Sequence, residues 1–190
     1  MSLRYALLAL LRVGPMSGYD LQKQFSQSVG HVWYAPDSQI YPELRRMEAD
    51  GLVEAEEQPR GERATRRLYH ATDAGDRAFR AWIAAPLEYQ RVKDQSHLKA
   101  AYLETGTAEN ARAFFERHIA QWQAELDQWE HELARINGDE HPMLQRRLAV
   151  TPPAERNRTI AYKRHTYEGL VERARAEIAW AERGLELSAD

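Results

Sequence analysis

The 190-residue sequence contains no cysteine, which excludes disulfide bridges, thiolate metal sites and a cysteine nucleophile. It also lacks a run of about eighteen apolar residues, the length that a membrane-spanning helix needs. The formal net charge is only −3, so the bulk charge does not mark a nucleic-acid-binding protein. The hydrophobic fraction of 43% beside 29% charged residues is typical of a soluble globular chain, which we expect to be cytoplasmic.

Signatures of catalysis are absent as well. The sequence has no glycine-rich phosphate loop, no nucleophile elbow and no zinc-ligand spacing. Its seven histidines are scattered, and none pairs with a carboxylate in an arrangement typical of a metal site. We therefore expect no enzyme, no catalytic residue, no metal and no cofactor. The acidic residues Glu125, Glu130 and Glu132 are expected to be solvated flanks of a helix rather than acid–base pairs.

The first 86 residues contain the pattern of four helices and two strands. Leucines at helical spacing predict a first helix over 2–13, and Ser17 can cap a second helix that Gly30 ends. A third helix follows the candidate caps Asp37 and Ser38, with an inner stripe of Ile40, Leu44 and Met47. Strands are expected at 52–58 and 66–71. Thr72-Asp73 then caps a fourth helix, and Pro86 closes the unit.

An arginine-rich loop connects the two predicted strands. Residues 60–67 hold four arginines against one glutamate, so an exposed hairpin here would form a positive tip on a mildly acidic body. Three helices, a hairpin with a basic tip and a further helix describe a winged helix-turn-helix. In that fold the third helix enters the major groove, and the wing reaches phosphates or the minor groove.

The second half, residues 87–190, has a different pattern. After a short helix near 93–104, apolar residues recur in steps of three and four along two long helices, one capped by Thr107 and one closing the chain. Two such seams in about a hundred residues need partners to bury them, which favours dimerisation. We expect a mainly α fold, with residues 1–86 as a DNA-binding domain and 87–190 as an antiparallel long-helix dimerisation domain. The residues expected at the dimer contact are Trp129, Leu133, Val171, Ile178, Trp180 and Leu185.

Five segments in order resemble the PadR family of bacterial repressors. They are Ser17-Gly18-Tyr19-Asp20-Leu21, Gly30-His31-Val32-Trp33-Tyr34, Ser38-Gln39-Ile40-Tyr41-Pro42-Glu43-Leu44, Gly51-Leu52-Val53 and Thr72-Asp73-Ala74-Gly75. The match spans residues 3–85, and the second half resembles the helical Vir-type domain of the longer subfamily. The resemblance implies a homodimer, a palindromic operator and, in many members, a small effector such as a phenolic acid that weakens DNA binding.

By motif position, the resemblance places Ser38, Gln39 and Tyr41 at the DNA, and helix geometry adds Arg45. The basic positions of the wing match Arg63, Arg66 and Arg67 loosely. Glutamine can pair with adenine, arginine with guanine or phosphate, and hydroxyl groups with phosphate oxygens. An aromatic effector pocket is a further hypothesis, and its candidate residues are Trp33, Tyr34 and Trp122. Packing is the competing interpretation of each aromatic residue.

Two alternatives to a ligand-released repressor stay open. One is a DNA-binding regulator without a ligand, controlled by its abundance or by a partner protein. The other is a winged-helix module that binds proteins and not DNA, an interpretation that the negative net charge favours. The second alternative predicts that Arg66 and Arg67 are engaged in ion pairs instead of being free at the wing.

Overall fold

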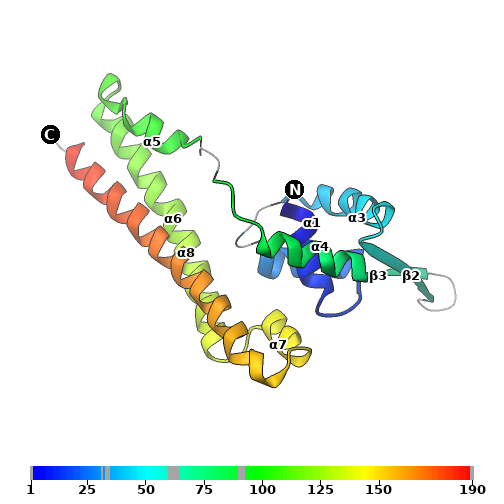
Figure 1. Ribbon diagram of the computed structural model, residues 1–190. Helices are drawn as coiled ribbons and strands as arrows, with labels where there is room; N and C mark the ends of the chain where they lie inside the picture. The colour runs from blue at the N-terminus through cyan, green and yellow to red at the C-terminus, as the bar shows by residue number, and fades with distance from the viewer. Residues whose placement is uncertain (1, 31, 33–34, 60–64, 90–92, 189–190) are drawn as a thin grey trace. The chain divides into compact units, whose positions relative to one another are not determined.

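The computed structural model describes residues 2–30, 32, 35–59, 65–89 and 93–188. These fall into two compact units, Met1–Leu87 and Glu88–Asp190. Figure 1 shows that the N-terminal unit combines helices with a small sheet, whereas the C-terminal unit is built from helices. The mainly helical architecture agrees with the expectation from the sequence.

The N-terminal unit follows the predicted order of elements, with short additions between them. The third helix begins later than Asp37, because a 3₁₀ turn precedes it, and Pro42 therefore lies within its first turn, where a missing N–H is tolerated. In chain order the elements are α1 (Ser2–Leu11), β1 (Met16–Ser17), α2 (Gly18–Gln24), the π-helical turn η1 (Phe25–Val29), the 3₁₀ turn η2 (Asp37–Gln39), α3 (Ile40–Ala49), β2 (Val53–Pro59), β3 (Thr65–Ala71) and α4 (Asp73–Ala84).

The sheet is antiparallel with the strand order β1-β3-β2. Strands β2 and β3 form the predicted wing hairpin, in register from Val53 opposite Ala71 to Pro59 opposite Thr65. The sequence did not predict β1, whose Met16 pairs with Tyr69 of β3. Two residues are too few to show a period-2 pattern, so only the pairing itself defines this strand.

Predicted capping residues fix the ends of the helices. The Ser17 side chain accepts a hydrogen bond from the backbone N–H of Asp20, whose carboxylate accepts in return from the Ser17 N–H, a capping box. Thr72 caps α4 in the same way, accepting from the Gly75 N–H. Gly51, with φ of 69°, follows α3 in the left-handed conformation that glycine adopts readily. The core between these helices contains Leu7, Leu8, Leu21, Phe25, Ile40, Leu44, Met47 and Val53, each at most 2% exposed.

Two long helices dominate the C-terminal unit and run side by side in opposite directions (Figure 1). A short helix lies between the end of the first long helix and the start of the second, where the chain turns back. The buried core of this unit consists of Leu126, Trp129, Ile136, Leu144, Tyr167, Val171 and Ala174. The elements are α5 (Gln95–Ala100), the 3₁₀ turn η3 (Leu103–Thr105), α6 (Ala108–Asn137), α7 (Pro142–Ala149) and α8 (Pro153–Leu187).

The two apolar seams pack against each other within one chain. Trp129 and Val171, expected at a dimer contact, are buried in this intramolecular core at 6% and 5% exposure. The seams are thus buried without a second chain, so the seams alone do not indicate a dimer. The other four residues expected at a dimer contact, which are Leu133, Ile178, Trp180 and Leu185, are half-buried.

One expectation about α6 was wrong. Glu132 is not on a solvated flank but is 5% exposed, because His141, the N-cap residue of α7, lies 3.7 Å from its carboxylate and Lys163 and Tyr167 of α8 lie nearby. Such a contact depends on the path of the chain after α6, which helical periodicity does not report. Among the described residues, none of the helices has the length and hydrophobicity that a bilayer crossing requires.

Candidate nucleic-acid interface and a cavity in the C-terminal unit

Helix α3 presents a polar outer face opposite its buried stripe. Ile40, Leu44 and Met47 are fully buried, which places Tyr41 and Arg45 on the surface. Tyr41 is 41% exposed, which is more than we expect of a tyrosine that only packs in the core. Ser38 and Gln39 lie in the exposed 3₁₀ turn just before the helix. The four residues predicted at the recognition helix are therefore available to a partner.

The structure brings this helix together with the wing. A concave surface of about 530 Å³ lies between α2, α3 and β3. Tyr41 and Arg45 line it with Arg66 and Arg67 of β3, four of the predicted DNA-contacting residues. Arg63 lies outside the described residues. The remaining lining residues are Ser17, Gly18, Tyr19, Asp20 and Tyr69.

Tyr19 belongs to this surface but was not predicted as a site residue. It is the second residue of α2, is 68% exposed, and lines the concavity together with Tyr41. The sequence offered one signal, an aromatic residue two positions after the capping Ser17 within a motif that resembles the PadR family. Periodicity could not identify it, because a helix of seven residues has too few turns to separate an inner from an outer face.

Gly18 determines where the Tyr41 ring lies. A Cβ atom at Gly18 would be 2.5 Å from Cε1 of Tyr41, closer than any side chain permits. The absence of a side chain thus allows the ring to rest against the first turn of α2. The phenol of α3 thus rests against α2, and Tyr41 lines the concave surface.

The two wing arginines differ in their partners. Arg67 Nη2 lies 2.6 Å from Glu48 Oε1 of α3, and its guanidinium stacks over the Tyr69 ring at 5.5 Å. Arg66 and Arg45 make no ion pair with any residue in the described ranges. The protein-interaction alternative expected both wing arginines to be paired, and only Arg67 is. Two guanidinium groups therefore remain available to phosphates on this surface.

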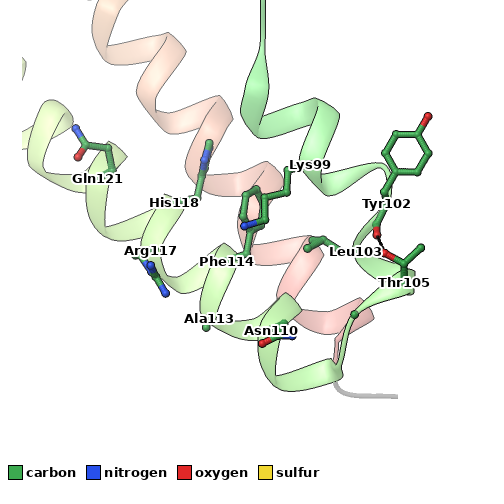
Figure 2. A pocket seen from close by; sticks show the side chains of 11 residues that line it. Lys99, Tyr102, Leu103, Thr105, Asn110, Ala113, Phe114, Arg117, His118 and Gln121 are labelled. Carbon is green, nitrogen blue, oxygen red and sulfur yellow. Dashed lines mark hydrogen bonds between the residues drawn. The ribbon is translucent and has the colours of Figure 1, made fainter.

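A second cavity, of about 850 Å³, lies within the C-terminal unit between α5, η3 and α6. Figure 2 shows Lys99 reaching from α5 towards Phe114 of α6, where the ammonium is 5.8 Å from the ring centroid. Arg117 and His118 follow on the same helix. His118 Nε2 is 3.1 Å from Glu177 Oε2 of α8, which holds the imidazole ring in place. The cavity offers cations and aromatic faces, with no carboxylate among its lining residues.

One predicted effector residue, Trp122, lies elsewhere in the C-terminal unit. Trp122 is half-buried and packs on Trp129 with ring centroids 6.4 Å apart, and Arg173 lies 5.2 Å over its ring. It does not line the cavity. Trp33 and Tyr34 lie outside the described residues. What the sequence could not show is that α5 closes against α6, since this contact depends on how the short helix folds back.

A buried polar cluster lies at the other end of the C-terminal unit, under α7. His141 is 1% exposed and its Nδ1 accepts the backbone N–H of Leu144, which caps α7. Burial lowers the pKa of His141 to about 4, with a further decrease from the nearby positive charge of Lys163. Desolvation also lowers the pKa of Lys163 to about 8, and burial raises the pKa of Tyr167 above its usual range. Within the described residues no three histidine or carboxylate side chains are placed to hold a metal ion.

Comparison with known proteins gives a consistent answer. A family model described as the transcriptional regulator PadR-like family matches residues 7–81. The negative transcriptional regulator PadR of Bacillus subtilis (strain 168) is 31% identical over 143 residues, which cover 74% of this chain and 78% of the relative.

Two crystal structures of Bacillus subtilis PadR are similar over nearly the full length. The complex with operator DNA aligns with a TM-score of 0.76 at 24% identity, covering 98% of this chain and 97% of that chain. The complex with p-coumaric acid aligns with a TM-score of 0.71 at 25% identity, covering 99% and 96%. The matched relatives are regulators and not enzymes, as the sequence predicted. The present chain belongs to the PadR-like family of transcriptional regulators.

Proposed function

We propose that this regulator is a cytoplasmic repressor that binds a palindromic operator as a homodimer and is released by a small aromatic acid. The observation that carries the proposal is the concave surface between α2, α3 and β3, which joins Tyr41 and Arg45 of the recognition helix to Arg66 of the wing. Guanidinium groups suit guanine edges and phosphates, and phenolic hydroxyls suit phosphate oxygens. The same fold is found in a relative crystallised with operator DNA.

A dimer would place two recognition helices about 34 Å apart, one turn of DNA, and so would read a palindrome. The C-terminal helices offer a surface for the second copy, since Leu133, Ile178, Trp180 and Leu185 stay partly exposed after α6 and α8 have paired within the chain. Light scattering of the purified protein at micromolar concentration should give twice the chain mass.

The cavity between α5 and α6 is our candidate effector site. A relative has been crystallised with p-coumaric acid, an aromatic carboxylate. Lys99 and Arg117 supply positive charge for the carboxylate, and Phe114 supplies an aromatic face for the ring. A ligand of this kind regulates DNA binding only when its affinity differs between the free and the DNA-bound conformations.

DNA binding is tested by fluorescence anisotropy with the duplex that the wild-type protein enriches most from a random library. Tyr41→Ala should weaken binding at least tenfold, because it removes a hydroxyl that we assign to a phosphate oxygen and a hydrogen bond to a charged group contributes ~1.5–3 kcal/mol. Arg66→Gln should weaken binding to any DNA and reduce the salt dependence by about one released counterion. Arg112→Gln removes the same charge from the exposed face of α6 and should change neither quantity.

The effector is tested by calorimetry with p-coumaric acid and by its effect on the DNA affinity. Replacing both Lys99 and Arg117 by glutamine should reduce the ligand affinity about a hundredfold or more, because two charge-assisted hydrogen bonds contribute ~1.5–3 kcal/mol each. If wild-type protein binds the duplex but the acid never changes that affinity, the regulator without this ligand is correct.

The protein-interaction module keeps one supporting observation, the ion pair of Arg67 with Glu48. It predicts that no duplex is enriched from the library by the wild-type protein. Such a result would move the assignment from DNA to a protein partner.

A further inference from the structure

Arg4 of α1 contacts both ends of the recognition helix. Its Nε lies 3.1 Å from Oε1 of Glu43, in the first turn of α3, and its Nη2 lies 3.2 Å from Oδ2 of Asp50, the residue that caps the C-terminus of α3. The Cα atoms of Glu43 and Asp50 are separated by about two helical turns, or ~10 Å along the axis, so both side chains lie on the same face of α3. A single guanidinium thus joins the first turn of the helix that we propose to read DNA to its C-terminal cap.

Glu43 is the more tightly held of the two partners. Its side chain is 12% exposed, against 28% for Arg4 and 51% for Asp50. The second carboxylate oxygen of Glu43 accepts a hydrogen bond from Arg46 Nη1 at 3.3 Å. An ion pair shielded in this way is screened less by water and salt than one at the open surface. The Arg4–Glu43 contact is therefore directional and persistent, whereas the Asp50 contact is a weaker second arm.

The apolar packing of α3 acts on its inner face. Ile40, Leu44 and Met47 anchor that face in the core, and hydrophobic burial itself has no preferred direction. One charge-assisted hydrogen bond to Glu43 and an ion pair with Asp50, both from a planar, forked guanidinium, add a directional constraint on α3. Lysine in place of Arg4 has the same charge but offers one compact ammonium in place of the fork whose Nε and Nη2 face the two carboxylates.

We infer that Arg4 is a positioning residue for sequence recognition: it sets the rotation and axial position of α3, and hence the placement of Arg45 against base edges and of Tyr41 against the DNA backbone, without touching DNA itself. The inference rests on the proposed operator binding. It assigns to the first helix of the chain a role in specificity, because misplacing a recognition helix affects base contacts while leaving general attraction to phosphates in place.

The decisive variant is Arg4→Lys, since it preserves the charge. Anisotropy is measured with two probes, the duplex that wild-type protein enriches from a random library and a random-sequence duplex of the same length. We expect the affinity for the enriched duplex to fall about tenfold, the effect of one lost base contact, and the affinity for the random duplex to stay within about twofold. An unchanged ratio of the two affinities in a folded variant overturns the inference.

Glu43→Gln gives a test in which general electrostatics and loss of the Arg4 contact predict opposite changes in affinity. Removing a carboxylate beside the DNA should tighten binding to every duplex if electrostatics alone matters, whereas loss of the Arg4 contact should weaken binding to the enriched duplex. Glu56→Gln removes the same charge from an exposed position on the wing and should tighten binding to both probes. If Glu43→Gln behaves like Glu56→Gln, Arg4 does not position α3.

Circular dichroism and thermal melting show whether each variant is folded at the assay temperature. Should Arg4→Lys melt too low, Asp50→Asn removes only the exposed arm of the contact and is expected to lower the same affinity ratio by a smaller factor. If Asp50→Asn and every other folded variant keep the wild-type ratio of affinities for the enriched and the random duplex, the inference is overturned. Failure of the wild-type protein to enrich any duplex would instead overturn the proposed operator binding, and the inference with it.

Discussion

Acid should destabilise the C-terminal unit through one residue, His141. Its Nδ1 accepts the Leu144 N–H at 3.2 Å, so the neutral ring carries its proton on Nε2, which lies 3.7 Å from Glu132 Oε2. Protonation of Nδ1 would replace an acceptor by a donor and remove the cap of α7. The second proton would also place a charge in a site that is 1% exposed and faces Lys163.

The magnitude follows from the pKa. Burial, together with the charges of Lys163 and Arg135 and against the attraction of Glu132, lowers the pKa of His141 from 6.5 to about 4. The pKa of His141 is lower in the folded than in the unfolded protein, so the neutral ring stabilises the fold. This stabilisation is complete above the unfolded pKa and is lost as the pH falls towards the folded pKa. Each pKa unit corresponds to about 1.4 kcal/mol, so the full effect is ~3 kcal/mol, of which ~2 kcal/mol is lost by about pH 5.

The assay is urea unfolding across this pH range, comparing wild type with His141→Asn. Asparagine is a good N-cap but does not titrate, so both proteins share every other ionisation. Wild type should lose ~2 kcal/mol more stability than His141→Asn between neutral pH and about pH 5. Lys163→Met should reduce this difference, because it removes the positive charge that lowers the pKa of His141. Coinciding pH profiles of wild type and His141→Asn would refute the reasoning.

Three further substitutions test other contacts. Glu48→Gln should strengthen DNA binding up to about fivefold, because it releases Arg67 from an exposed ion pair worth ~0.2–1 kcal/mol. Fluorescence anisotropy measures the DNA affinity. If the gain in affinity persists in an Arg67→Gln background, the release of Arg67 is not its cause. Gly169→Ala in the middle of α8 meets nothing within 4 Å and should raise the free energy of unfolding by ~0.5–1 kcal/mol. Gly75→Ala places its Cβ against the Leu52 carbonyl oxygen and should lower that free energy by ~1–3 kcal/mol, the usual cost of overpacking; thermal melts of the pair should move in opposite directions.

The sequence predicted the elements of this fold where local chemistry determines them. Ser17, Thr72 and Thr107 were identified as caps because a short side-chain oxygen before an apolar stripe satisfies the first N–H groups of a helix, and each accepts such a bond. The recognition helix and the wing followed from the same kind of pattern. Strand β1 could not be predicted, since it exists only through its pairing with β3.

Contacts between distant segments were beyond the sequence. An apolar seam indicates that a helix is buried on one side, but not whether the partner belongs to the same chain, and for Trp129 and Val171 it does. Glu132 has the spacing of a solvated residue and is buried beside His141. At the candidate interface, Arg66 and Arg67 have equivalent positions in the motif, yet only the structure shows that Glu48 engages one of them.

The close contact of α8 with α6 has a mechanical consequence. Small residues of α8 are buried opposite bulky residues of α6, and a Cβ at Gly184 would overlap the Phe115 ring. A slide of one helical turn would bring larger side chains together, so the two helices are locked in one register. The 30 residues of α6 then act as a stiff rod of about 45 Å, with the cavity beside α5 at one end and the His141 cluster under α7 at the other. We therefore expect a displacement imposed at one end to be felt at the other, because the closely packed pair of helices moves as a unit.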